Sequence, residues 1–194
     1  MKSAIIILVL GFLFVACSPF VREGAHEIDV TGLPFEGSPD ASVTVAVFSD
    51  YQWPACAELE PLLQQVLEKY PEDVKVVIKN IPLHSFSRKA AIAAVAAGKQ
   101  GKFWEMNEKL FANQKELSDA KVETIAKEIG LNMEQFNKDL KDPTIVSLID
   151  RDFNDGLQAN IRKTPTIFIN GKLLIRESLS GLQEAIEAEL KKKT

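Results

Sequence analysis

The sequence predicts an α/β fold in which one domain is split by a helical insertion. An apolar strand, a helix and a second apolar strand follow one another over residues 43–81. Residues 85–161 then show only helical periodicity, and the remainder contains a hairpin and a final helix. Because a strand–helix–strand unit packs a sheet against helices, this order indicates one mixed domain with an extra helical part.

Residues 1–17 have the pattern of an export signal. Lys2 precedes an apolar run over 4–16, shorter than the roughly 18 to 20 residues of a membrane-spanning helix. Phe14-Val15-Ala16-Cys17 resembles a bacterial lipoprotein lipobox, although Phe14 stands where leucine is preferred. We expect residues 1–16 to be removed as a signal peptide, and a lipid on Cys17 to anchor the protein in the cell envelope, facing the periplasm or the extracellular side. An uncleaved anchor and ordinary secretion are the alternatives.

Composition favours one globular domain without nucleic-acid or metal chemistry. The chain has 194 residues and a net charge of −4, and its length suits a single domain with a sizeable core. No basic face with interleaved aromatic residues is present, and the basic residues 191–193 are typical of a solvated helix end. The two histidines, His26 and His84, show no ligand spacing, so we expect neither a metal nor a cofactor.

The elements before the insertion follow in order. Residues 17–39 read as a tether, with a short strand over 27–30, and residues 40–84 as the first part of the α/β domain. Residues 43–48 form a buried strand, and a helix runs from Pro54 to about residue 70, kinked at Pro61. Residues 74–81 form the next strand, with Lys75 and Lys79 pointing outward.

The insertion is predicted over 85–161, and the α/β domain resumes over 162–194. The insertion begins with an alanine-rich helix, and Asp142-Pro143 has the form of a cap at the start of its last helix. Residues 166–169 and 172–176 read as two strands joined by a type I′ turn at Asn170-Gly171. Residues 180–183 resemble a capping box that begins the final helix.

Four motifs in this order resemble the DsbA-like family of thiol-disulfide oxidoreductases. They are Phe48-Ser49-Asp50-Tyr51-Gln52, Ile81-Pro82-Leu83-His84, Gln100-Gly101-Lys102-Phe103-Trp104 and Thr164-Pro165-Thr166. The resemblance implies a thioredoxin fold with an inserted helical domain. It also implies that the helix at Pro54 carries the Cys-Pro-x-Cys motif, with Trp53 in place of the first, attacking cysteine and Cys56 as the second, resolving one.

The lone thiol of Cys56 admits three interpretations. It is an inert core residue, a thiol that reacts with peroxide as the one-cysteine peroxidases of the superfamily do, or a thiol that forms a mixed disulfide with a glutathione-like thiol or a partner protein. At the first position the helix N-terminus lowers a cysteine pKa, but Trp53 has no thiol to ionise. Both redox interpretations require a reachable Cys56, the candidate catalytic residue.

The resemblance also implies a groove for extended polypeptide, lined by Trp53, Pro54, Tyr51, Thr164 and Pro165. Thr164-Pro165 matches the family's cis-proline loop, although Lys163 stands where glycine is common. Tyr51 lines the groove or merely covers the helix start. His84 is read either as structural or as assisting catalysis. The favoured function is participation in extracytoplasmic thiol-disulfide or protein-folding processes through Cys56, and the alternative is a redox-inactive module that binds polypeptide.

Overall fold

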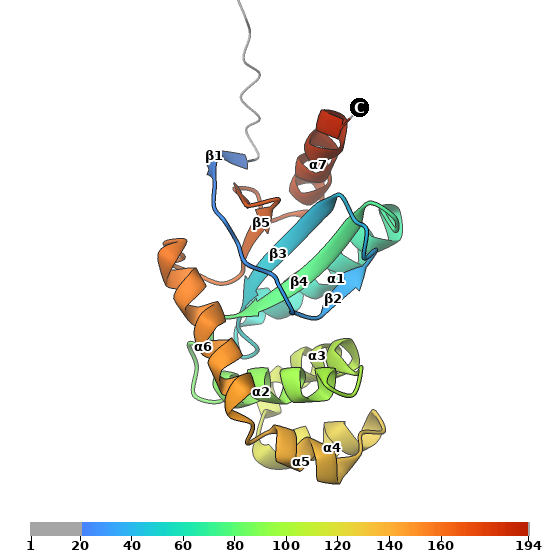
Figure 1. The fold of residues 1–194 in the computed structure, drawn as a ribbon, viewed down its shortest axis with the longest axis vertical. Helices are drawn as coiled ribbons and strands as arrows, with labels where there is room; N and C mark the ends of the chain where they lie inside the picture. Colours follow the sequence, from blue (N-terminus) through green and yellow to red (C-terminus); the bar gives the residue numbers. More distant parts are fainter. Residues whose placement is uncertain (1–20, 194) are drawn as a thin grey trace, which may run out of the picture.

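A computed structural model describes residues 21–193, and the predicted signal and the lipid site at Cys17 lie outside these residues. Within them the strands form one sheet in the order β1-β6-β5-β3-β4-β2 (Figure 1). β3 and β4 are parallel, and every other pairing is antiparallel. The strands are β1 (Val21–Ala25), β2 (Phe35–Gly37), β3 (Val43–Ser49), β4 (Val74–Asn80), β5 (Thr166–Ile169) and β6 (Lys172–Leu174).

Helices cover the sheet and form a second layer below it. α1 (Pro54–Lys69) and α7 (Leu179–Leu190) pack together on one face, and the other face meets α6 (Pro143–Gln158) and the segment 26–33. Figure 1 shows α6 running from the lower layer up along the sheet. The lower layer contains α2 (Ser87–Gly98), α3 (Phe103–Ala112), the short η1 (Gln114–Glu116), α4 (Asp119–Glu128) and α5 (Met133–Asp139), and η2 (Lys191–Lys193) follows α7.

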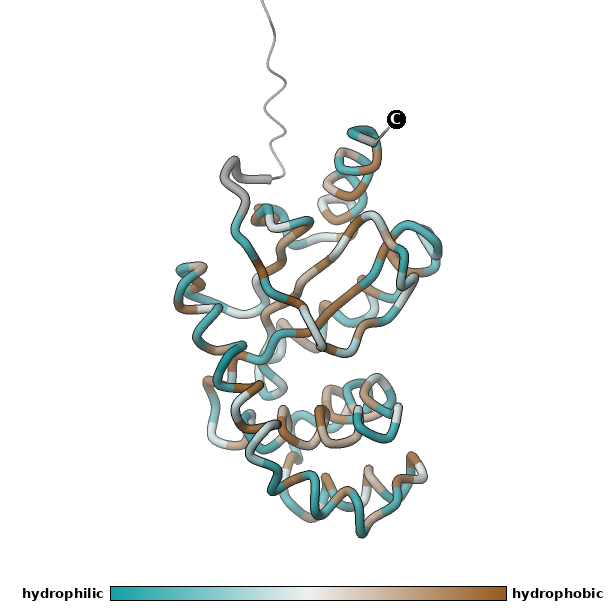
Figure 2. The backbone as a smooth tube through the Cα atoms, viewed as in Figure 1, coloured by the Kyte–Doolittle hydropathy of each residue, from teal (hydrophilic) through white to brown (hydrophobic). Residues whose placement is uncertain are grey.

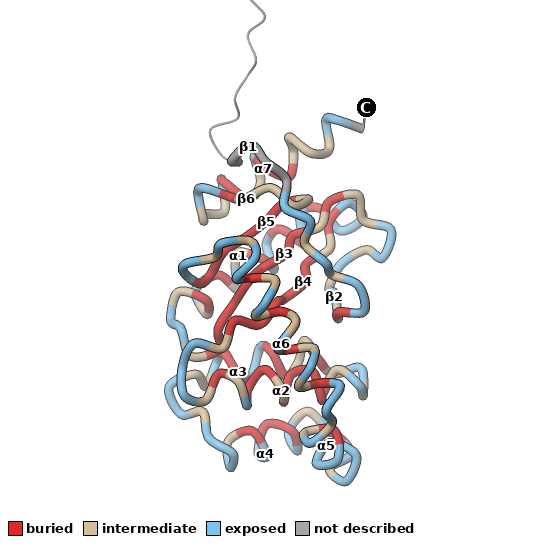
Figure 3. The backbone as a smooth tube through the Cα atoms, turned by 60° about the vertical axis from the view of Figure 1, so that its left-hand side comes forward, coloured by how far each residue is buried: buried red, intermediate tan, exposed pale blue. Residues whose placement is uncertain are grey.

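The central strands are buried on both faces. β3 is mostly apolar, β4 carries Lys75, Lys79 and Asn80 among its apolar residues, and both strands are buried at most positions (Figures 2 and 3). α2 forms the centre of the helical layer, where it contacts α3, α4, α5 and α6. Its alanine-rich sequence allows those four helices to approach closely, because small side chains leave room for neighbouring backbones.

The sequence predicted most elements and misplaced two. The hairpin turn is confirmed, with positive φ at both Asn170 and Gly171, and Asp142 caps α6 as predicted. The strand predicted over 27–30 is wrong: the two short strands lie on either side of it. The backbone after this segment turns, and a side chain stabilises the turn, since Thr31 N donates to Oδ1 of Asp29. The predicted capping box is also wrong, because Ser178 caps α7 two residues earlier.

The outward direction predicted for Lys79 is wrong. Its side chain is fully buried between β4 and α6. Its Nζ donates to Asp155 at 2.7 Å and to the carbonyl of Asp29 at 2.6 Å, and it lies 3.1 Å from Oδ1 of Asp152 without hydrogen-bond geometry. Burial raises the pKa of Asp152, and the charge of Lys79 opposes that rise. The cluster joins α6 and the 26–33 segment to the sheet.

Candidate functional site

The candidate site is the turn between β3 and α1. Trp53 takes the N-cap position with an extended backbone, and Pro54 follows as the first helical residue. Trp53 N donates to the carbonyl of Asp50, and Cys56 N donates to the carbonyl of Trp53. Since tryptophan has no side-chain acceptor, the first turn of α1 has no side-chain cap. The turn therefore places an indole at the positive end of the helix.

Asp50 holds this turn in place from inside the protein. Its buried carboxylate receives the backbone N–H groups of Gln52 at 2.8 Å and Leu83 at 2.6 Å. The hydroxyl of Ser87 donates to Oδ1, and Nδ1 of His84 lies 3.0 Å from Oδ2. Because a carboxylate oxygen can only accept, this contact assigns the imidazole proton to Nδ1. One side chain thus connects the turn, the loop after β4 and the start of α2.

Cys56 lies behind the turn in the main core. Its residue is 1% exposed, and Asp50 N donates to its Sγ at 3.5 Å. Burial raises the pKa of the thiol, whereas hydrogen bonds with Ser49, Asp50 N and Thr164 lower it. The net direction is upward, so the fold favours the neutral thiol over the nucleophilic thiolate.

Trp53 lies on the outer side of the same turn. It is 44% exposed, and its ring stacks on that of His84 with centroids 5.6 Å apart and planes 18° apart. Nε2 of Gln114 donates to the carbonyls of both Tyr51 and Trp53 at 3.3 Å, so the insertion supports the turn from below. The stack gives the helix start a broad aromatic surface open to solvent.

The loop before β5 has the conformation that the family resemblance implies. The Thr164–Pro165 peptide bond is cis, as the family resemblance implied. Both residues are buried, and the residues before them, Arg162 and Lys163, are exposed. Arg162 and Lys163 border a cavity of about 100 Å³, which Leu83 and Leu157 also line. Leu83 and Leu157 are each more than half exposed, so apolar surface extends from the turn along α6.

Tyr51 lies inside the protein and cannot line the predicted groove. The residue is 2% exposed, its ring packs on Phe111, and its hydroxyl donates to Oδ1 of Asn107 at 2.9 Å. Nδ2 of Asn107 in turn donates to Glu60 on α1 at 2.8 Å. Burial, with smaller contributions from two nearby carboxylates, raises the pKa of Glu60 to about 7. Tyr51 therefore covers the helix start, the second of its two predicted roles.

The structure thus brings together most of the predicted site and adds residues that the sequence did not single out. Trp53 and Pro54 are exposed at the turn. Thr164 and Pro165 are buried, and Thr164 contacts Cys56 on the inner side of the turn. Asp50, Ser87 and Gln114 were missed. The available signal for Asp50 is an acidic residue directly after a strand of mostly buried residues, a place where a charge needs partners. Among residues 21–193, no group of three or more histidine, cysteine or acidic side chains could hold a metal ion.

Fold and site together define an α/β protein with a thioredoxin-type helix start. A family model described as thioredoxin matches residues 30–188, and the chain belongs to this family, in its DsbA-like branch of thiol-disulfide oxidoreductases. That Trp53 occupies the position of the family's first cysteine stays a prediction.

Solved structures support the same assignment. A thioredoxin-like oxidoreductase from Silicibacter pomeroyi is 29% identical, with a TM-score of 0.73 over 82% of this chain and 92% of that chain. Oxidised BdbD from Bacillus subtilis is 28% identical, with a TM-score of 0.75 over 86% of this chain and 97% of that chain. Both similarities extend over most of each chain, so the insertion is part of the shared architecture.

Curated relatives match over a smaller share of their length. The Na⁺/H⁺ antiporter NhaA 3 of Salinispora tropica is 34% identical over 139 residues, which are 70% of this chain and 21% of that protein. The chain therefore spans about a fifth of the length of such relatives. Within residues 21–193, no helix is long and apolar enough to cross a membrane.

Proposed function

We propose that this protein binds extended polypeptide in the cell envelope through a DsbA-like groove and without thiol chemistry. The observation that carries the proposal is the contrast across one helical turn: the exposed residue is Trp53, and the only thiol there, Cys56, is buried. Single-thiol chemistry, with a peroxide, a glutathione-like thiol or a partner-protein thiol, needs a reachable sulfur and a stabilised thiolate. Burial opposes both requirements.

The groove provides the contacts that an extended chain requires. The backbone beside Thr164 and Pro165 faces the helix start, where a client segment can pair as an added strand. The indole of Trp53 and the exposed Leu83 supply apolar surface for alternate side chains of that segment. Arg162 borders this surface and favours clients with acidic residues there, whereas Lys163 is already paired with Glu177 at 2.9 Å.

The envelope location and the lipid anchor belong to the same proposal. The N-terminal sequence pattern supports export and acylation at Cys17, which would hold the groove close to a membrane surface. Attachment to a membrane would bring the groove near newly exported, incompletely folded chains.

The test measures binding of an unfolded chain that has no free thiol. Reduced, carbamidomethylated α-lactalbumin is titrated into the protein, residues 21–194, and binding is followed by calorimetry. We expect Trp53→Ala to weaken binding about tenfold, because burial of an aromatic side chain contributes roughly 1.5 to 3 kcal/mol. Phe35→Ala is the matched control, because Phe35 is 43% exposed on the edge strand β2. Equal effects of the two substitutions, or loss of binding in Cys56→Ser alone, would overturn the proposal.

A further inference from the structure

Most of the large apolar side chains that the described residues expose lie near one segment, residues 161–163. Leu83 and Leu157 line a cavity that borders this segment, and Ile175 lines a second cavity that shares it. Each of the three is more than half exposed. Trp53 stacks on the residue that follows Leu83. Because soluble proteins rarely expose apolar side chains in groups, this surface indicates a binding site.

The cavity beside Leu83 has about the size of one aliphatic side chain. Its volume is about 100 Å³, which is the space of about three water molecules. Gly156 brings α6 close to the sheet here, since a Cβ at this position would lie 2.5 Å from Cδ1 of Ile81. The apolar side chains of the lining are Ile81, Leu83, Phe153, Leu157 and Ile161. An apolar side chain that enters this space therefore leaves water without burying a polar group of its own.

Arg162 brings an unpaired positive charge to this cavity. The residue is exposed, and its guanidinium has no ion pair with another residue of the described part of the chain. Lys163 is the other cation of the lining, and it is already paired with Glu177 at 2.9 Å. Asp155, on the last part of α6, is paired with Lys79 at 2.7 Å. The charge left without a partner at the cavity is therefore positive, and it favours a carboxylate on the ligand.

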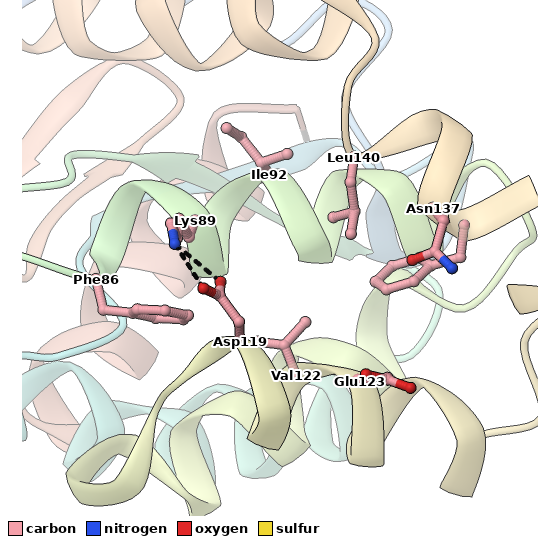
Figure 4. A pocket seen from close by; sticks show the side chains of 9 residues that line it. Phe86, Lys89, Ile92, Asp119, Val122, Glu123, Asn137 and Leu140 are labelled. Atoms are coloured by element: carbon pink, nitrogen blue, oxygen red, sulfur yellow. Dashed lines mark hydrogen bonds and ion pairs between the residues drawn. The ribbon is translucent and has the colours of Figure 1, made fainter.

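A cavity in the helical insertion has no such free charge. It lies between α2, α4 and α5 and has a volume of about 340 Å³ (Figure 4). Nζ of Lys89 donates to both carboxylate oxygens of Asp119, at 2.9 and 2.7 Å, and Glu123 is paired with Lys127 at 2.6 Å. Since these charged groups pair with one another, they select no ligand, and this cavity serves as a control site.

The small cavity is continuous with the proposed groove. Residues 161–163 lead directly to the cis peptide bond, beside which a client strand is proposed to pair. On the opposite wall, Leu83 precedes the histidine that stacks on Trp53. Residues two positions apart in an extended chain face the same side, about 6.6 to 6.8 Å from each other. A client in the groove can therefore place one side chain in the cavity and another, two residues away, over Arg162.

We propose that this cavity and Arg162 select client segments in which an aliphatic residue lies two positions from an acidic residue. This inference rests on the proposed function and names part of its substrate class. The aliphatic side chain fills the space between Leu83 and Leu157 and loses its contact with water. The carboxylate accepts hydrogen bonds from the guanidinium of Arg162, whose planar group can donate two at once.

The experiment uses three short peptides and backbone amide NMR. Acetyl-Glu-Ser-Leu-Ser-Glu-amide carries the pattern in both chain directions. Acetyl-Glu-Ser-Ala-Ser-Glu-amide lacks the aliphatic side chain, and acetyl-Lys-Ser-Leu-Ser-Lys-amide has the opposite charges. Each peptide is titrated into the protein, residues 21–194.

We expect the first peptide to shift amides within residues 81–84 and 156–163 in a saturable manner. It should bind about tenfold more tightly than the alanine peptide, because a leucine side chain is buried. It should bind about fivefold more tightly than the lysine peptide, a smaller ratio because exposed charge pairs are weak. The net charge of the chain, −4, favours the lysine peptide, so a preference for glutamate requires a local cation.

Two variants and their matched controls locate the peptide. Ile161→Phe fills the cavity and should weaken binding of the first peptide about tenfold, whereas Ile92→Phe, the same change in the cavity of the insertion, should leave it unchanged. Arg162→Gln should remove the preference for glutamate. Lys141→Gln, which removes an exposed charge without an ion pair in the described residues, should leave that preference intact. Urea denaturation checks that each variant folds, and the leucine and alanine peptides test the cavity without any substitution.

Several results would overturn the inference. Equal affinity for the leucine and alanine peptides would contradict the cavity, and an unchanged preference in Arg162→Gln would contradict the cation. The absence of saturable shifts, or shifts confined to the insertion, would contradict both. Shifts of residues 156–163 that depend on protein concentration without peptide would identify a second copy of this chain as the occupant.

Binding of α-lactalbumin tests the proposed function separately. If α-lactalbumin binds and Trp53→Ala weakens it while the three peptides bind alike, the groove stands and the cavity is not part of it. If α-lactalbumin binds equally to Trp53→Ala and the natural protein, the proposed function fails whatever the peptides do.

Discussion

The inner and outer sides of the turn before α1 differ in nearly every physical respect. On the inner side, Asp50 and Cys56 are buried and their polar atoms have partners. On the outer side, Trp53 is almost half exposed and contacts mainly His84. Changes on the inner side should therefore alter stability, and changes on the outer side should alter binding. The buried side of the turn is held by hydrogen bonds, and the exposed side presents an aromatic surface to solvent.

Replacing the exposed Trp53 with a thiol should have the largest effect, because it makes the outer side of the turn reactive. Trp53→Cys places a thiol at the N-terminus of α1, where the helix dipole and free N–H groups stabilise a thiolate. We expect this variant to reduce insulin with dithiothreitol as the electron donor, whereas the natural protein gives only the background rate. The control is Trp53→Cys combined with Cys56→Ser, which lacks the resolving thiol. No gain in Trp53→Cys would mean that the support of the site no longer suits thiol exchange.

Removing the inner support should have the next largest effect. Asp50→Ala leaves the N–H groups of Gln52 and Leu83 and the hydroxyl of Ser87 without their acceptor. We expect the free energy of unfolding to fall by roughly 3 to 5 kcal/mol, because each buried unsatisfied donor costs about 1 to 3 kcal/mol. Urea denaturation measures the change, and Asp150→Ala, which removes a surface ion pair with Arg88, should cost less than about 1 kcal/mol. Similar losses in both variants would contradict the role of Asp50.

Replacing the buried Cys56 should change the free energy of unfolding less than Asp50→Ala does, and it should leave binding unchanged. Cys56→Ala removes one sulfur from a packed site, and we expect a loss of about 1 to 2 kcal/mol in the free energy of unfolding. Binding of carbamidomethylated α-lactalbumin should stay unchanged, because Cys56 does not reach the surface. A loss of binding with unchanged stability would show that the sulfur contacts the client.

Glu60 gives an effect on stability that depends on pH. Its folded-state pKa of about 7 lies above the ordinary value of 4.5, so the fold favours the protonated carboxyl group. This contribution to stability is fully present below about pH 4.5 and is lost as the pH rises through about 7. The free energy of unfolding of the natural protein should therefore fall over this range relative to Glu60→Gln. Glu58→Gln, on the same helix, controls for the loss of one charge, and parallel curves for all three proteins would contradict the account.

Local patterns in the sequence predict most of the fold, whereas they do not predict polar contacts between residues far apart in the chain. The I′ turn at Asn170-Gly171 and the cap at Asp142 depend on adjacent residues, and both are confirmed. The alternation of its strand predicts Lys79 on the surface. Its burial depends on Asp152 and Asp155, more than seventy residues away in the chain. Periodicity carries no information about such a partner.

In the candidate site, too, some features followed from the sequence and others depended on long-range packing. The cis bond before Pro165 and the exposed Trp53 followed from the family resemblance. The burial of Cys56 is one of the three interpretations of its thiol. The inward direction of Tyr51 did not follow from the resemblance, because it depends on how α3 packs against the turn. Phe111 and Asn107 on α3 hold Tyr51 inside the protein. The exposed fraction of Tyr51 therefore depends on two residues of α3 that lie outside the four motifs.

The most direct test of the central claim is the alkylation rate of Cys56 in the folded protein, residues 21–194, measured with iodoacetamide across a range of pH by mass spectrometry. We predict no modification below the pH at which an ordinary thiol ionises, about 8.5, and rapid modification after denaturation in urea. The Trp53→Cys, Cys56→Ser variant is the positive control and should react readily when folded. Rapid modification of Cys56 in the folded natural protein, with an apparent pKa well below about 8.5, would contradict the account and favour single-thiol redox chemistry.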